Sequence, residues 1–131
     1  MQIHQSAEDY LETILMLNQR MGRVRSIDVV NELGYTKASV SIAMKKLREN
    51  GYIAVDGEGN LTLLEPGREI AERIYSRHRL LTHFFVQLGV EEDVAAEDAC
   101  KAEHILSEQT LEKIREYALL HDAESTLKKE D

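Results

Sequence analysis

The stretch ACKAEH, residues 99–104, combines three side chains that can bind a metal ion: the thiol of Cys100, the carboxylate of Glu103 and the imidazole of His104. Residues three or four positions apart share one face of a helix, so these groups would point at one spot. Without a cation such a group is unfavourable, because like charges repel and desolvation costs free energy. The pattern favours a divalent-metal site, although a cysteine among alanines is also typical of a small core residue.

Two further segments carry possible ligands. The stretch EDYLE, residues 8–12, places Asp9 and Glu12 three positions apart on a predicted helix, and His78 lies in RHRLL, residues 77–81. The plain alternatives are acids in the first turn of a helix, where negative charge is favourable, and a solvated histidine. The residues alone leave both interpretations open. If the three sets meet in space, they offer oxygen, nitrogen and sulfur donors to one divalent ion.

The elements that would position these residues follow from hydrophobic periodicity and turn residues. The pattern predicts helices over residues 7–21, over 26–33 with Ser26 as its cap, and over 37–50 with Thr36 as its cap. Two short helices joined by a glycine-containing turn, the second basic and rich in serine, are typical of a helix-turn-helix. The next residues, YIAVDGEGNLTLLEPG, predict a two-stranded hairpin, which in this position is a wing.

The second half of the chain is predicted to contain only helices. Apolar residues at helical spacing indicate a long helix over 67–88, another over 90–107 and a third over 107–120, and the polar last ten residues are expected to fray. The predicted fold is mainly α, with a winged helix-turn-helix DNA-binding domain over residues 1–65 and an all-helical domain over residues 66–131.

Charge is unevenly distributed along the chain. The whole chain has a formal charge of −8, yet residues 19–50 hold seven lysines and arginines against three acids, a net of +4. A basic segment in an acidic protein is typical of a face that binds phosphate, although a solvated basic helix has the same composition. With one cysteine, no run of eighteen apolar residues and no secretory pattern at the start, we expect a cytoplasmic protein without a membrane span.

The order of these motifs resembles a known family. EDYLE, the helix-turn-helix, the wing, RHRLL and EDACKAEHILS follow one another over residues 6–120 as in the diphtheria toxin repressor/manganese transport regulator family of metal-dependent transcriptional regulators. The chain is similar to the short, two-domain members. The resemblance implies a helical metal-binding and dimerisation domain after the DNA-binding domain. It also implies a homodimer that binds a double-stranded DNA operator and represses metal-uptake genes, with metal joining the first helix to the dimerisation domain.

The resemblance also implies functional residues. The metal ligands would be Asp9, Glu12, His78, Cys100, Glu103 and His104, and the DNA contacts would come from Thr36, Lys37, Ala38, Ser39, Ser41 and Ile42. One departure matters: the manganese branch has a glutamate where this chain has Cys100, and a cysteine there resembles the iron branch. The ancillary ligands of the iron branch fall on Thr82 and Ala96, so that site is lost in its usual form.

The donor types restrict the metal. Carboxylates and imidazoles suit Mn²⁺ and Fe²⁺, while a thiolate favours softer, later metals. We therefore expect Fe²⁺ or Mn²⁺ as the effector, Fe²⁺ slightly favoured because of Cys100, with Zn²⁺ or Co²⁺ binding in vitro. Two other functions remain: a metal-independent winged-helix regulator that senses a small molecule, and a small metalloenzyme. The second is disfavoured, because the chain lacks HExxH, a phosphate-binding glycine loop and a nucleophile motif.

Overall fold

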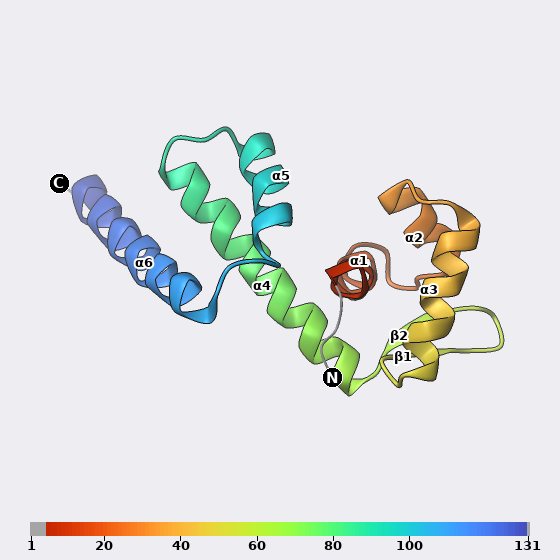
Figure 1. The fold of residues 1–131 in the computed structure, drawn as a ribbon. Coiled ribbons are helices and arrows are strands. Elements are labelled where there is room, and N and C mark those ends of the chain that lie inside the picture. The colour runs from red at the N-terminus through yellow and green to blue at the C-terminus, as the bar shows by residue number, and fades with distance from the viewer. Residues whose placement is uncertain (1–4, 131) are drawn as a thin grey trace. The chain divides into compact units, whose positions relative to one another are not determined.

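The computed structural model describes residues 5–130, with side chains through residue 123, and the chain divides into two compact units after Ile74. The elements are α1 (Gln5–Met21), α2 (Ser26–Leu33), α3 (Lys37–Glu49), β1 (Ile53–Val55), β2 (Leu61–Leu63), α4 (Glu65–Gln87), α5 (Glu92–Ala102) and α6 (Glu108–Glu130) (Figure 1). The predicted mainly-α fold with a helix-turn-helix and a wing is confirmed. The predicted domain boundary at residue 65, where α4 begins, stays a prediction.

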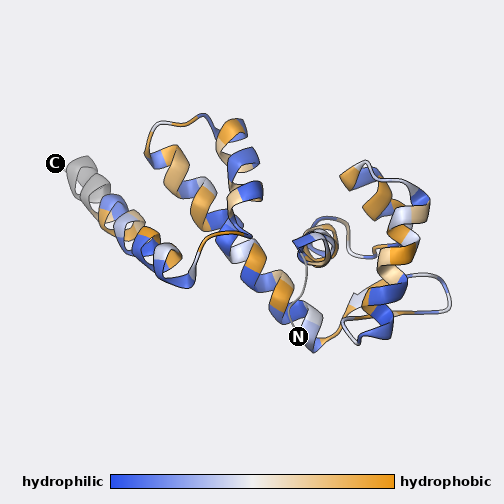
Figure 2. Ribbon diagram, in the orientation of Figure 1, coloured by the Kyte–Doolittle hydropathy of each residue, from blue (hydrophilic) through white to orange (hydrophobic). Residues whose placement is uncertain are grey.

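The first unit is organised around the buried face of α1. Leu11, Ile14 and Leu17 are buried, and α1 contacts α2, α3 and β2. Apolar and polar residues alternate along the helices, as Figure 2 shows most clearly on α4. Burying an aliphatic side chain stabilises a fold by about 1.5–3 kcal/mol, so this face accounts for much of the unit's stability. The apolar stripe predicted for α3 is buried as well: Val40, Met44 and Leu47.

The two helices of the helix-turn-helix begin in different ways. Thr36 caps α3 as predicted, because its Oγ1 accepts a hydrogen bond from the backbone N–H of Ser39 at 3.1 Å. The predicted cap of α2 is wrong by one position: Arg25, not Ser26, is the N-cap residue. The backbone N–H of Arg25 donates to Asp28 Oδ2 at 2.8 Å, so the acid in the first turn satisfies a backbone group at the start of the helix.

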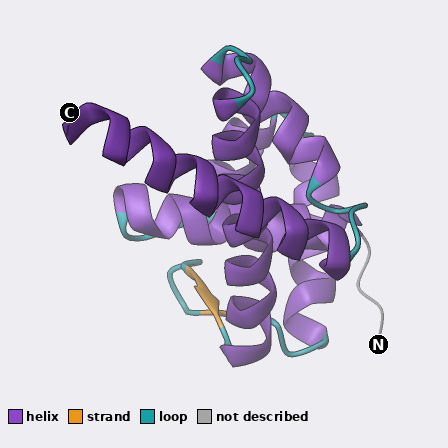
Figure 3. Cartoon of the chain, turned by 90° about the vertical axis from the view of Figure 1, so that its left-hand side faces the viewer, coloured by secondary structure: helices purple, strands orange, loops and turns teal. Residues whose placement is uncertain are grey.

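The wing is a two-stranded antiparallel hairpin, drawn in orange in Figure 3, with the register Ile53–Leu63, Ala54–Thr62 and Val55–Leu61. Asp56 fixes its turn, because Oδ1 accepts from the backbone N–H groups of Glu58 and Asn60, both at 2.9 Å. The bonds from Asn60 are the main cause that holds the pKa of Asp56 below its ordinary value. Leu61 N–H donates to Val24 O at 2.7 Å, which ties the wing to the segment before α2.

The second unit packs α4, α5 and α6 around Leu81, Ala99 and Leu111, with Leu80, Phe85, Ala102, Leu106 and Ile114 partly buried against them. The ends of α4 and α6 are also joined by polar contacts, since His83 Nε2 lies 2.9 Å from Asp122 Oδ2. That hydrogen bond is the main cause that lowers the pKa of Asp122. Among the described residues, no helix has both the length and the apolar character needed to cross a membrane.

Two helix ends in this unit differ from the prediction. The helix expected over residues 90–107 ends at Ala102, and a turn leads to Ser107, whose Oγ accepts from Thr110 N–H at 3.2 Å and caps α6 as predicted. The fraying expected for the last ten residues, 122–131, is not observed over 122–130, because α6 continues to Glu130, and residue 131 lies outside the described part of the chain. The early end of α5 places Glu103 at its C-cap and His104 in the turn.

Gly67, in the first turn of α4, generates a stability prediction. A Cβ at this position would overlap the backbone carbonyl oxygen of Tyr52 and lie 3.0 Å from its carbon. We expect Gly67→Ala to destabilise the protein by about 1–3 kcal/mol in urea denaturation, the usual cost of overpacking. Gly57→Ala is the matched control, because a Cβ added there would have no atom within 4 Å and only a small change follows. Equal midpoints for the two variants would contradict this packing.

Candidate metal centre and DNA-binding surface

The carboxylate of Glu103 lies at the centre of the candidate metal site. Glu103 is 0% exposed. Its Oε2 lies 3.0 Å from Nδ1 of His78 on α4, and its Oε1 lies 3.4 Å from Nε2 of His104. Oε1 forms no hydrogen bond with any described residue. Buried polar atoms normally have a partner, so this oxygen, on a carboxylate between two imidazoles, marks a place where a divalent cation would be favourable.

The two imidazoles approach Glu103 from different elements. His78 comes from the middle of α4 and its side chain is 20% exposed, whereas His104 comes from the turn after α5 and its side chain is 1% exposed. Both nitrogens and both carboxylate oxygens are donors to metals such as Mn²⁺ and Fe²⁺. The helical unit by itself therefore assembles three of the six predicted ligands, and the residues present fit a divalent ion.

The other predicted acids lie on α1, which forms as expected. Asp9 is half-buried and Glu12 is 5% exposed, and the spacing of three places them on one face of the helix. Thr13 Oγ1 donates to the backbone oxygen of Asp9 at 2.7 Å, which satisfies that hydroxyl within the helix. Burial, with smaller contributions from Tyr35 and Asp9, raises the pKa of Tyr10 above its ordinary value. A buried glutamate in this apolar helix face is unusual unless its charge is compensated.

Cys100 differs from the other predicted ligands. It lies on α5 and is exposed. Its thiol is not among the donor atoms of described His, Cys, Asp and Glu residues that cluster in threes within 4.8 Å. Because α5 ends at Ala102, the single helical face expected for Cys100, Glu103 and His104 does not extend to the histidine. Metal binding by Cys100 stays a prediction.

The predicted DNA-binding residues lie at the start of α3. All six are exposed: Thr36, Lys37, Ala38, Ser39, Ser41 and Ile42. Ile42 is an apolar side chain left 58% exposed on a basic helix, which suits contact with a thymine methyl group. Beside this stretch, Lys45 and Arg48 line a hollow of about 260 Å³ together with Ser26, Ser41, Met44 and Val55. Hydroxyl and cationic groups around a hollow of this size can bind phosphate oxygens.

No role was predicted for Arg77, the residue before His78. Its guanidinium contacts the turn that carries Glu103 and His104. No local sequence pattern marks an arginine beside a predicted ligand histidine, because the partners of Arg77 lie 26 and 31 residues further along the chain. Only the helical position of Arg77, adjacent to His78, could have pointed to it.

Comparison with known proteins identifies the family. Residues 2–61 match the family described as iron dependent repressor, N-terminal DNA binding domain, and residues 64–120 match iron dependent repressor, metal binding and dimerisation domain. The chain is 31% identical over 125 residues to the transcriptional regulator MntR of Bacillus velezensis, which covers 95% of this chain and 88% of that protein. The chain belongs to the iron-dependent repressor family. The resemblance to the diphtheria toxin repressor/manganese transport regulator group is confirmed.

The chain is also similar to another regulator and to a solved repressor structure. The chain is 35% identical over 113 residues to a helix-turn-helix transcriptional regulator of Methanocaldococcus jannaschii, covering 85% of this chain and 90% of that protein. Among solved structures, a manganese-dependent transcriptional repressor in complex with manganese matches with a TM-score of 0.78 and 29% identity over 86% of this chain. The chain spans about half the length of that repressor, 52%.

Membership in the iron-dependent repressor family fixes the general function. The protein is a metal-dependent transcriptional regulator with an N-terminal DNA-binding domain and a C-terminal metal-binding and dimerisation domain. Its partners are DNA and a second subunit, and it uses a divalent metal as cofactor. The family consists of repressors with a metal-binding domain and not of enzymes, so the metalloenzyme and the metal-independent sensor are both wrong.

Replacing Glu103 separates a metal site from a structural ion pair. Glu103→Gln keeps the side-chain shape and removes a buried charge, so in a chelator we expect a melting temperature equal to or above that of the unchanged protein. With Mn²⁺ at a hundredfold excess over Kd, a bound ion stabilises the unchanged protein by about 2.7 kcal/mol, and the variant loses this increment. Thermal melts with and without Mn²⁺ measure both. Glu116→Gln, at an exposed pair with Lys113, serves as control.

A variant that melts lower in chelator and still gains the full Mn²⁺ increment would show that Glu103 is a structural partner of His78 and not a ligand.

Proposed function

We propose that Asp9 and Glu12 of α1 bind the same divalent ion as His78, Glu103 and His104, and that this ion joins the DNA-binding domain to the dimerisation domain. The observation that carries the proposal is the buried Glu103 carboxylate, held 3.0 Å from His78 and 3.4 Å from His104 with one oxygen lacking a hydrogen bond to a described residue. A site that is half assembled within one unit needs further anionic ligands, and α1 offers two.

Electrostatic repulsion among the carboxylates explains why such a site would respond to the presence of a metal ion. Three carboxylates, from Asp9, Glu12 and Glu103, repel one another at short range when no cation is bound. The divalent ion supplies the compensating positive charge and enough coordination positions for oxygen and nitrogen donors. In its absence α1 is not held to the helical unit, and binding to DNA has to supply the cost of ordering it.

For the metal we propose Mn²⁺, with Fe²⁺ as the second candidate. The donors that support the site are carboxylates and imidazoles, which suit Mn²⁺, while the thiol of Cys100 is exposed. The sequence favoured Fe²⁺ slightly because of that thiol. The similarity to MntR of Bacillus velezensis and to the manganese-dependent repressor also supports Mn²⁺.

The proposed action on DNA follows from the symmetry of a dimer. The two copies of α3 must enter successive major grooves about 34 Å apart, so the angle between the DNA-binding domains controls affinity. Holding α1 in place restricts that angle. An allosteric coupling of about 1–3 kcal/mol, the usual size, changes operator affinity about 5–150-fold. We propose that the regulator uses this difference in the cytoplasm to repress genes for metal uptake when the ion is abundant.

Replacing a ligand histidine tests the metal dependence. The probe is a DNA duplex selected from a random pool by the Mn²⁺-loaded protein, and affinity is measured by fluorescence anisotropy without oxygen. We expect Mn²⁺ to strengthen binding of the unchanged protein by about 5–150-fold and to have no effect on His104→Ala. His83→Ala is the matched control, because His83 pairs with Asp122 in the same unit and outside the site.

A full Mn²⁺ response of His104→Ala would refute the proposed site.

Cys100→Ala tests the choice of metal in the same assay with Mn²⁺, Fe²⁺, Co²⁺ and Zn²⁺. We expect its metal ranking to match that of the unchanged protein, because the thiol is exposed. A changed ranking would make Cys100 a ligand and favour Fe²⁺.

Lys37 tests the DNA surface. Lys37 is the first residue of α3 and is exposed, so its ammonium can bind a phosphate. We expect Lys37→Ala to weaken binding to the selected duplex and to lower the slope of log K against log salt by about 0.9, the value of one phosphate contact. Lys113→Ala, on α6, should change neither quantity. An unchanged affinity and slope for Lys37→Ala would place the DNA contact elsewhere.

A further inference from the structure

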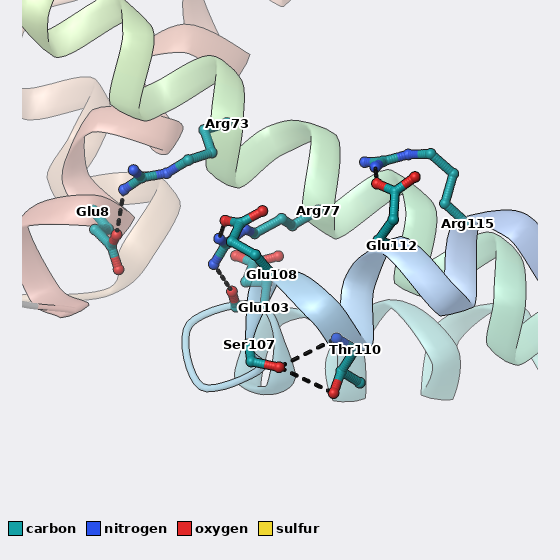
Figure 4. Close-up of polar contacts among 9 residues, drawn as sticks. All are labelled: Glu8, Arg73, Arg77, Glu103, Ser107, Glu108, Thr110, Glu112 and Arg115. Atoms are coloured by element: carbon teal, nitrogen blue, oxygen red, sulfur yellow. Dashed lines mark hydrogen bonds and ion pairs between the residues drawn. The ribbon is translucent and has the colours of Figure 1, made fainter.

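Arg77 makes two contacts with the turn between α5 and α6. Its Nη1 donates to the backbone oxygen of Glu103 at 3.2 Å, and its Nη2 donates to Glu108 Oε1 in the first turn of α6 (Figure 4). The side chain is 14% exposed, so it lies largely within the protein. One side chain of α4 therefore holds both ends of the short segment that carries Glu103 and His104.

The contact with Glu103 uses its backbone and leaves its carboxylate free for other partners. Glu103 is the C-cap residue of α5, and its carbonyl is among the last ones of the helix, which have no partner within the helix and carry partial negative charge. A guanidinium is a favourable partner there. Because the bond is to the carbonyl, Arg77 fixes where the backbone of Glu103 lies while both carboxylate oxygens stay directed at the imidazoles of His78 and His104.

The two contacts of Arg77 differ in strength, because solvent screens them to different extents. Glu108 is 79% exposed, so its ion pair is screened by water and salt. The hydrogen bond to Glu103 is partly buried and is screened less. A lysine could keep the positive charge, but its single ammonium lacks the planar fork that lets a guanidinium serve two acceptors at once.

We infer that Arg77 is a positioning residue for the metal site: by holding the backbone of Glu103 and the start of α6, it presents Glu103 and His104 to the ion beside His78. This inference rests on the proposed function, since it assigns a support to the same ligands. Arg77 binds no metal itself. Its loss leaves the ligand atoms present but free to move, which weakens metal binding without removing a donor.

Metal binding by Arg77 variants tests the inference. We expect Arg77→Met to lower Mn²⁺ affinity by about 10-fold or more, the usual effect of removing a group that orients a ligand. Arg77→Lys should recover part of the loss. Free Mn²⁺ is measured by electron paramagnetic resonance, and the visible spectrum of the Co²⁺ protein reports the coordination. At saturating Mn²⁺, all variants should bind the selected duplex as the unchanged protein does, because the ligands themselves are intact.

Arg115→Met is the matched control. Arg115 pairs with Glu112 on α6 at 3.0 Å and is 44% exposed, so its loss should leave Mn²⁺ affinity unchanged. Wild-type Mn²⁺ affinity in Arg77→Met, with His104→Ala defective, would overturn the role of Arg77 alone. Wild-type affinity in both would refute the proposed site as well.

Thermal melts in chelator separate positioning from folding. If Arg77→Met melts lower in chelator by as much as it does with Mn²⁺, Arg77 stabilises the fold only, and the inference is wrong. If Arg77→Met does not fold, Arg77→Lys decides: a folded variant with weakened Mn²⁺ binding and an altered Co²⁺ spectrum supports the inference, and one with unchanged binding overturns it.

Discussion

A carboxylate buried between two imidazoles is the constraint around which the candidate metal site is arranged. Glu103 has no exposed surface, and an ionised group in such a place is costly unless charges or hydrogen bonds compensate it. His78 and His104 lie on either side of it, from α4 and from the turn after α5. The packing of Leu81, Ala99 and Leu111 holds these elements together, so the apolar core and the polar site specify the same arrangement of helices.

The DNA-binding unit is stabilised by different interactions. Its core is largely aliphatic, and at the start of α3 and in the wing Thr36 and Asp56 satisfy backbone N–H groups. These particular bonds join residues two to four positions apart, while the bond from Leu61 N–H to Val24 O ties the wing to the segment before α2. The unit can therefore keep the shape of α3 and the wing without contributions from the predicted ligands, as the proposed mechanism requires.

Local patterns were enough to predict most of the fold. The cap of α3, its buried stripe and the hairpin follow from neighbouring residues, and each is confirmed. The end of α5 was predicted wrongly because residues 103–107 include good helix formers, and only contacts with α4 show why the chain turns there. His78 and Glu103 could be named from motifs, but their pairing depends on a contact across 25 residues that no local pattern records. The role of Arg77 escaped prediction for the same reason.

The end of α5 at Ala102 has an evolutionary consequence. Residues on a regular helix cannot shift without moving their neighbours, whereas a short connection between two helices tolerates substitutions and changes of length. Because Glu103 and His104 sit where α5 gives way to such a connection, changes of length in residues 105–107 can shift these two side chains relative to His78 while the aliphatic interior stays intact. If these side chains bind the proposed ion, such changes would alter the ion radius that the site prefers.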